Sequence, residues 1–199
     1  IHVLDKRKSN LNISITEVLN NLRSDTLGQT SSITGRPAVP MPPSTTFARQ
    51  FAAQFAEVEV DTATGQIKIL DFLCVQDSGR IINPQVMKNQ VIGGSICGSG
   101  FAIYEHLVFD PNSGAIKNAN LLDYKLLRCA DFPHKAKVLF EEMPDPVGPF
   151  GARGAGESPI AASISAVCQA VYNATGVWID MPMTPERVYT ALQRQKRLN

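Results

Sequence analysis

A single carboxylate, Glu157, follows a run of small residues and stands at the start of a predicted helix. The stretch 150–163 reads FGARGAGESPIAAS, so Gly154, Ala155 and Gly156 directly precede the acid. A carboxylate at a helix start lies near the positive end of the helix dipole, which favours its ionised form, whereas burial among small apolar groups disfavours that form. Opposed effects of this kind are typical of a general base that works near neutral pH.

Plainer interpretations of the same stretch stay open on the local pattern alone. Glu157 can simply accept hydrogen bonds from the free N–H groups of the helix start. The glycines of GARGAG can form a turn that lets a strand pass closely beneath the helix. A phosphate cradle is a weaker alternative, because the stretch lacks the lysine and the hydroxyl of a P-loop.

Alternating and apolar patterns predict the strands that must position this acid. Apolar and charged residues alternate over 55–61, and an apolar segment follows over 67–75, so we expect a β-hairpin with its turn at 62–65. A second hairpin is predicted over 106–118, and a further strand over 137–140.

Three helices are predicted by a capping side chain followed by proline, at Asn83-Pro84, Ser158-Pro159 and Thr184-Pro185. The first is expected to end near Glu105, and it contains four glycines, each costing about 1 kcal/mol relative to alanine. Such a helix must approach a neighbouring backbone or a bulky ligand closely. These glycines are Gly93, Gly94, Gly98 and Gly100.

The second helix carries almost no charge, and its apolar residues recur at helical spacing from Ile160 to Val171. We expect this helix to be buried nearly all round and to end at Gly176. Near the N-terminus, Ser14 and Glu17 form a capping-box pattern before a short helix over 16–23.

The predicted elements indicate one α+β domain over 1–199, with mixed sheets, hairpins and buried helices. Residues 1–50 form a peripheral helix and loop, including a Pro-rich loop over 35–46, and residues 51–199 form the core.

Composition excludes several classes of protein. Nineteen basic and eighteen acidic residues give a formal charge of +1, which does not indicate nucleic-acid binding. No apolar run is long enough for a membrane span, and no leader is recognisable. Because the first residue is Ile1, we expect a processed chain or a piece of a longer one.

Cysteines and histidines give no metal-binding pattern. Four cysteines are widely separated, at Cys74, Cys97, Cys129 and Cys168, and we expect buried thiols in a reducing compartment, the cytoplasm. Three histidines, His2, His106 and His134, are expected at the surface.

Four segments together resemble the C-terminal part of the molybdenum hydroxylase large subunit, the xanthine dehydrogenase and aldehyde oxidase family. They read FAEVEVDTATGQIKI, DSGRIINPQVMKNQVIGGSICGSGFAIYEHL, GARGAGESPIAA and MTPERV. The resemblance extends from about Leu11 to Leu192 and keeps the segments in order. One departure is Ser158, where family members commonly have a second proline.

The resemblance implies roles for individual residues. Glu157 would lie beside the molybdenum as the general base. The reaction would hydroxylate an electron-poor carbon of a heteroaromatic or aldehyde substrate. The small residues Gly154, Ala155 and Gly156 would make room for the pterin-bound metal and its substrate. Gln90 would approach the pterin and form directional hydrogen bonds with it, although an exposed helix residue is the plainer interpretation of Gln90. No residue of this chain is expected to ligate the metal.

The cofactor implied is a molybdenum-pterin, either molybdopterin or its cytosine dinucleotide form. The resemblance also implies a partner polypeptide that carries the other half of the site, and partner chains with iron–sulfur clusters and FAD. The cysteines of this chain lack the clustered spacing of iron–sulfur ligands. Two alternatives remain: a fragment similar to the carbon monoxide dehydrogenase large subunit, and a non-catalytic structural subunit.

Overall fold

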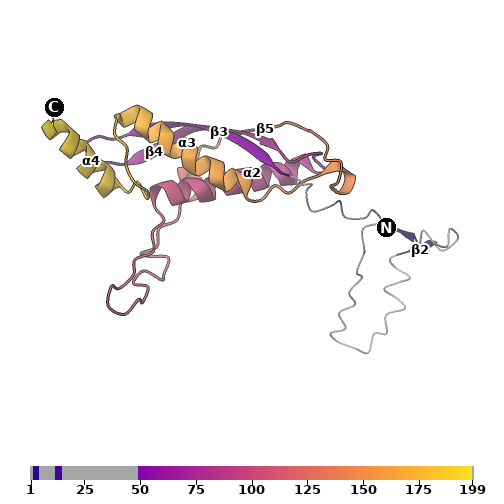
Figure 1. Cartoon of the computed structure of the whole chain (residues 1–199), viewed down its shortest axis with the longest axis horizontal. Helices are drawn as coiled ribbons and strands as arrows, with labels where there is room; N and C mark the ends of the chain where they lie inside the picture. Colours follow the sequence, from indigo (N-terminus) through magenta and orange to yellow (C-terminus); the bar gives the residue numbers. More distant parts are fainter. Residues whose placement is uncertain (1, 5–11, 15–48, 199) are drawn as a thin grey trace. The chain divides into compact units, whose positions relative to one another are not determined.

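The computed structural model describes residues 2–4, 12–14 and 49–198 (Figure 1). The chain divides into two units, Ile1–Met41 and Pro42–Asn199. The single domain expected from the sequence stays a prediction.

In the first unit, strand β1 (His2–Leu4) pairs antiparallel with strand β2 (Asn12–Ser14). Ser14 ends β2, where it pairs with His2, and its predicted role as a helix cap stays a prediction. The helix predicted over 16–23, with Glu17, and the Pro-rich loop over 35–46 lie outside the described residues.

The second unit contains a three-stranded mixed sheet in the order β3-β4-β5. Strands β3 (Phe51–Val60) and β4 (Ile67–Asp77) form the predicted antiparallel hairpin, with a bulge between Glu57 and Val58. Strand β5 (Lys137–Phe140) pairs parallel to β4, at the predicted residues. The α+β class and the mixed sheet are therefore confirmed.

Three α-helices, α2 (Pro84–Ile103), α3 (Ser158–Thr175) and α4 (Pro185–Leu198), occur where proline follows a polar residue. Short 3-10 turns, η1 (Cys129–Asp131) and η2 (Pro149–Gly151), lie in the loops. The predicted cap of α2 is present, because Val86 N donates to Asn83 Oδ1 at 3.1 Å. Gly176 ends α3 with φ +70°, as predicted. None of the helices among the described residues is long and apolar enough to cross a membrane.

Helices α2 and α3 lie side by side against one face of the sheet, with α3 over β3 (Figure 1). Every second residue of β3, including Ala56, Val58 and Val60, packs into the core beneath them. The segment between α2 and η1 projects from this layer (Figure 1). The second hairpin predicted there is reduced to its turn and a single bridge between Phe109 and Ile116.

Two expectations about burial were wrong. Helix α3 has an exposed stripe at Ala161, Ser165, Gln169 and Asn173, because the face turned away from β3 and α2 meets no other element in the described part of the chain. Absence of charge therefore did not indicate burial within this chain. The cysteines also differ among themselves: Cys74 and Cys168 are buried, Cys97 is half-buried, and Cys129 is exposed. The prediction of exposed histidines is confirmed for His106 and His134, and His2 has no described side chain.

Two glycines of α2 allow its backbone to approach α3 closely. A Cβ on Gly94 would lie 3.0 Å from Pro159 Cβ, and a Cβ on Gly98 would overlap the carbonyl oxygen of Ile160 and the hydroxyl of Ser163. The close neighbour predicted from the glycines of α2 is therefore α3 at these two positions. Because later residues of α2 meet later residues of α3, the two helices run in the same direction, and α3 begins beside Gly94, near the middle of α2.

We predict opposite effects of alanine at two nearby glycines of α2. Gly98→Ala should destabilise the protein, because its methyl group has no space beside Ile160. Gly93→Ala should leave the stability unchanged or raise it by up to about 1 kcal/mol, because Gly93 is exposed and nothing lies within 4 Å of a Cβ there. Urea unfolding of both variants measures the difference, and equal stability of the two would contradict this packing.

Candidate functional site

Glu157 is the residue immediately before α3, and its side chain is exposed. Within the described part of the chain, its carboxylate makes no capping hydrogen bond to the helix. The interpretation that Glu157 merely satisfies the helix start is therefore not supported. Ser158 was expected to cap α3, but it is the first residue of the helix, and its hydroxyl contacts Gln76 instead.

The glycines before Glu157 divide into two groups, of which the first has a structural reason. Gly151 has φ +83°, and its carbonyl oxygen accepts a hydrogen bond of 2.8 Å from Arg80 N. A Cβ on Gly79 would overlap this same carbonyl oxygen. Gly79 and Ala152 form an antiparallel bridge, so a strand does pass closely beside this part of the run.

The second group, Gly154 and Gly156, has no such reason. Neither residue has a positive φ. A Cβ on Gly156 would meet nothing within 4 Å, and a Cβ on Gly154 would meet only Gln50 Oε1, at 3.9 Å. Across the described residues, the backbone N–H groups of Gly154, Ala155 and Gly156 donate no hydrogen bond. Within the part of the chain that the structure describes, the run therefore presents three backbone donors without a partner, directly before a carboxylate.

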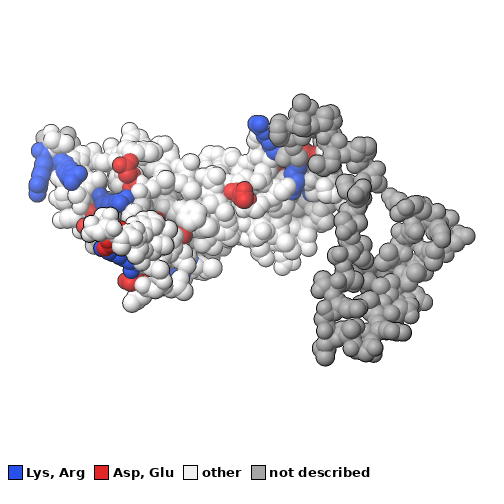
Figure 2. All heavy atoms as spheres, turned by 60° about the horizontal axis from the view of Figure 1, so that its bottom comes forward, with Lys and Arg blue, Asp and Glu red and all other residues white. Residues whose placement is uncertain are grey.

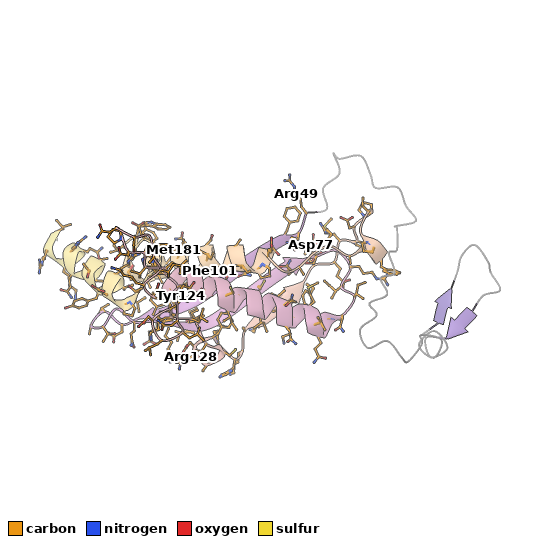
Figure 3. All side chains as sticks on the ribbon, turned by 90° about the horizontal axis from the view of Figure 1, so that it is seen from below. Arg49, Asp77, Phe101, Tyr124, Arg128 and Met181 are labelled. Atoms are coloured by element: carbon orange, nitrogen blue, oxygen red, sulfur yellow. The ribbon has the colours of Figure 1, made fainter. Side chains whose placement is uncertain are left out.

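Arg153 fixes the loop that carries these residues. Its guanidinium is buried, donates to Asp77 Oδ1 at 2.6 Å and lies 3.8 Å from Asp145 Oδ2. It also donates to the carbonyl oxygens of Met143, at 3.0 Å, and of Arg49. Figure 3 shows Arg49 and Asp77 at the same end of the second unit. Because Arg153 is held by these groups, it does not act as a counter-ion to Glu157.

Asp145 is the second anchor of this loop. Hydrogen bonds from Gly148 N at 2.7 Å and Val147 N at 2.8 Å, together with the Arg153 guanidinium, lower the pKa of the Asp145 carboxyl from its ordinary value. The ionised carboxylate therefore stabilises the loop that leads into Gly154.

Two glutamines from neighbouring strands hold the first turn of α3. Gln76 of β4 donates to Ser158 Oγ at 2.8 Å, and Gln54 of β3 donates to the carbonyl oxygen of Pro159 at 3.0 Å. Neither glutamine belongs to a motif that was recognised in the sequence. They were recognisable, however, as polar residues at inward-facing positions of otherwise apolar strands.

Gln90 lies on the exposed surface of α2, one helical turn before Gly94. Since Gly94 packs on Pro159 and the two helices run in the same direction, Gln90 is on the side of α2 that leads toward the loop before Glu157. The structure therefore brings both predicted parts of the site to the same region of the helix pair, where α3 begins. It encloses neither, because Gln90 and Glu157 are both exposed.

The residues in this region fit a large polar cofactor and not a protein-ligated metal. Free N–H donors, an exposed amide and open space suit a ring system rich in donors and acceptors. The buried amide oxygen of Gln50, which lies beside Gly154, lacks a hydrogen-bond partner in the described residues. No cluster of three or more His, Cys, Asp or Glu side chains suitable for a metal occurs among them.

Two open cavities lie at the opposite end of the second unit. Their volumes are about 660 and 700 Å³, and both are lined by Tyr104, Arg128 and Asp131. Figure 3 shows Arg128 and Tyr124 near the end of the helical layer that is distant from Asp77. These cavities are therefore separate from the loop that carries Glu157.

Residues 5–133 match the family of the molybdopterin cofactor-binding domain. The chain belongs to this family. The matched residues include Gln90 and end before the Glu157 loop, so the match does not itself test the role of Glu157.

Relatives of known class extend the comparison beyond these residues. The xanthine dehydrogenase molybdenum-binding subunit of Escherichia coli O157:H7 is 39% identical over 147 residues, which is 73% of this chain and 19% of the relative. The aldehyde oxidoreductase molybdenum-binding subunit PaoC of Escherichia coli (strain K12) is 38% identical over 144 residues, 71% of this chain and 20% of the relative.

A solved structure of the Cu,Mo-CO dehydrogenase in its carbon monoxide reduced state is also similar. It superposes with a TM-score of 0.68 and 28% identity, over 75% of this chain and 19% of the other. This molybdopterin cofactor-binding chain thus spans about one fifth of the length of the relatives that it matches.

We predict that alanine substitutions affect stability differently in the two groups of glycines in the loop. Gly151→Ala should destabilise the protein by about 1–3 kcal/mol, because the left-handed conformation disfavours a side chain and Pro144 lies 3.2 Å from the new Cβ. Gly156→Ala should leave the stability nearly unchanged. Thermal unfolding of the two variants tests this, and a large loss at Gly156 would mean that the fold itself requires this glycine.

We also predict a pH-dependent contribution of Asp145. Its folded-state pKa is lowered, so the stabilisation is complete above the ordinary pKa of about 4 and is lost as the pH falls through the folded-state value. Asp145→Asn should therefore lower the melting temperature at pH 7, and the difference from the unmodified protein should shrink toward pH 3. Asp180→Asn, at an exposed position, is the control. A difference that does not change with pH would contradict this assignment.

Proposed function

We propose that this chain supplies one wall of the molybdenum-pterin site of a molybdenum hydroxylase, with Glu157 as the general base. One observation carries the proposal: an exposed carboxylate follows two glycines that neither local packing nor backbone conformation requires. Such positions are expected where a bulky group from outside the chain must approach the backbone. Membership of the molybdopterin cofactor-binding family identifies the class of that group.

The residues proposed to hold the cofactor are Gln90, Gly154, Ala155 and Gly156. The three backbone N–H groups offer donors without a side chain to obstruct the approach, and the amide of Gln90 offers one donor group and one acceptor. Helix α3 begins directly after Glu157, so its positive dipole end favours anionic groups there.

When bound, the molybdenum-pterin supplies two-electron oxidation of a carbon with oxygen from water. The reaction converts a C–H group and water into a C–OH group, two protons and two electrons. Glu157 is proposed to accept one of these protons. It is the only acidic residue in the stretch 150–163. The substrate proposed is a small heteroaromatic or aldehyde.

A second polypeptide is proposed to complete the site. On the sheet face turned away from the helices, Phe51, Phe55 and Leu139 are 62%, 61% and 54% exposed, although such a face is normally polar when it meets water. Helices α2 and α3 carry only one charged residue between them, Lys88, and Figure 2 shows a mostly uncharged middle section on the face that it presents. The occupant proposed is the polypeptide that corresponds to the remaining four fifths of the relatives.

Further partners follow from the chemistry. The two electrons must leave the site, and we propose an iron–sulfur subunit and an FAD subunit as their route. The four free cysteines are consistent with a reducing compartment, so a cytoplasmic location is proposed.

A second candidate is a subunit similar to the large chain of carbon monoxide dehydrogenase. It is favoured by the similarity to the solved Cu,Mo-CO dehydrogenase. Metal analysis separates the two candidates, because copper present in proportion to molybdenum would favour the second.

We predict that Glu157→Gln strongly lowers turnover while leaving the fold and the molybdenum content unchanged. Glutamine keeps the size of the side chain but cannot accept the proton, so the turnover of the purified assembly should fall by about 10²- to 10⁴-fold. The assay uses xanthine, hypoxanthine and benzaldehyde with an artificial electron acceptor. Glu59→Gln, at an exposed position of β3, is the matched control and should behave like the unmodified protein. Near-normal turnover of Glu157→Gln would remove Glu157 from the mechanism.

A further inference from the structure

Gln76 is a fully buried amide in a strand whose other inward residues are apolar. It is 0% exposed, and its neighbours on the same side of β4 include Phe72 and Cys74. A buried amide is costly unless its hydrogen bonds are formed. Gln76 Nε2 donates to Ser78 Oγ and to Ser158 Oγ, each at 2.8 Å, and Ser158 Oγ lies 3.2 Å from Gln76 Oε1.

The bond to Ser158 joins two parts of the chain that are 82 residues apart. It links the sheet to the first residue of α3, which is the residue directly after Glu157. The bond to Ser78 stays within the end of β4 and does not reach α3. The chain therefore offers a matched pair of hydroxyl partners for one amide, of which only one contacts the helix.

The rest of the first turn is fixed from other directions. Gln54 donates to the carbonyl oxygen of Pro159, and Gly94 of α2 packs on the Pro159 ring. Glu157 itself has no such restraint on its side chain in the described residues, and its carbonyl oxygen only accepts bonds from Ile160 N, at 3.0 Å, and Ala161 N, at 3.4 Å. The backbone of Glu157 is thus placed by Ser158 and Pro159.

We propose that Gln76 is a positioning residue that places the backbone of Glu157, and with it the point from which the carboxylate extends, through its hydrogen bond with Ser158. The inference rests on the proposed function, because it assigns a purpose to the placement of the proposed base. Loss of the bond would let the first turn shift relative to the sheet. A general base displaced by about 1 Å can lose about 10²-fold in rate.

The test uses the purified assembly with its cofactor and three variants. Ser158→Ala removes only the hydroxyl, and Gln76→Met keeps the length of the side chain but removes the amide. Ser78→Ala removes the other hydroxyl partner of Gln76 and is the control. Measurements are kcat and KM for xanthine, hypoxanthine and benzaldehyde, molybdenum content, and hydrogen exchange of the Ile160 and Ala161 amides.

Ser158→Ala and Gln76→Met should each lower kcat by about tenfold to a hundredfold, with KM and molybdenum content nearly unchanged. Exchange at Ile160 and Ala161 should be faster in both variants. The double variant Ser158→Ala/Gln76→Met should have a kcat no lower than that of the single variants, because both changes remove the same hydrogen bond. Ser78→Ala should keep a normal kcat and normal exchange.

Normal kcat in Ser158→Ala, or unchanged exchange at Ile160 and Ala161, would overturn the inference even if Gln76→Met failed to fold. An equal loss of kcat in Ser78→Ala would also overturn it, because the effect would then come from strand packing. If Glu157→Gln is inactive while Ser158→Ala is normal, only the positioning role fails. If Glu157→Gln is active, the proposed function itself fails.

Discussion

The close contact between α2 and α3 is the constraint on which the site depends. Gly94 and Gly98 let the two backbones approach, and the contact fixes the helices in the same direction. As a result, the loop before Glu157 and the part of α2 that carries Gln90 come to the same region of the unit, although more than sixty residues separate them in the sequence. Larger residues at these two glycines would push the helices apart and separate the two halves of the proposed wall.

Ion pairs of Arg153 stabilise the loop that leads to Glu157. Arg153 links the end of β4 to the segment at Asp145, so the backbone is fixed immediately before Gly154. From Gly154 to Gly156 the backbone N–H groups have no partner among the described residues, and the two glycines have room for a side chain. Rigid support next to an unfilled surface is what a preorganised binding wall requires, and it is not what a simple helix cap requires.

Much of the fold could be predicted from the sequence because its signals are local. Alternation defined β3 and β4, and the Asn83-Pro84 pair defined the start of α2. Predictions failed where a distant partner decides the outcome. Ser158 has the right type and position for a cap, but its hydroxyl faces Gln76 of a strand far away in the sequence. The uncharged stripe of α3 is exposed because it meets no other element in the described part of the chain, and the charge pattern of the helix does not show this.

The central claim is that this chain forms one wall of a molybdenum-pterin site completed by another polypeptide. Elemental and pterin analysis of the chain purified from its native host, together with all co-purifying polypeptides, tests it most directly. The account predicts about one molybdenum and one pterin per copy of the chain, accompanied by iron and a larger polypeptide. An intact assembly without molybdenum and pterin would contradict it and leave Glu157 as a residue at the end of a helix in a structural subunit.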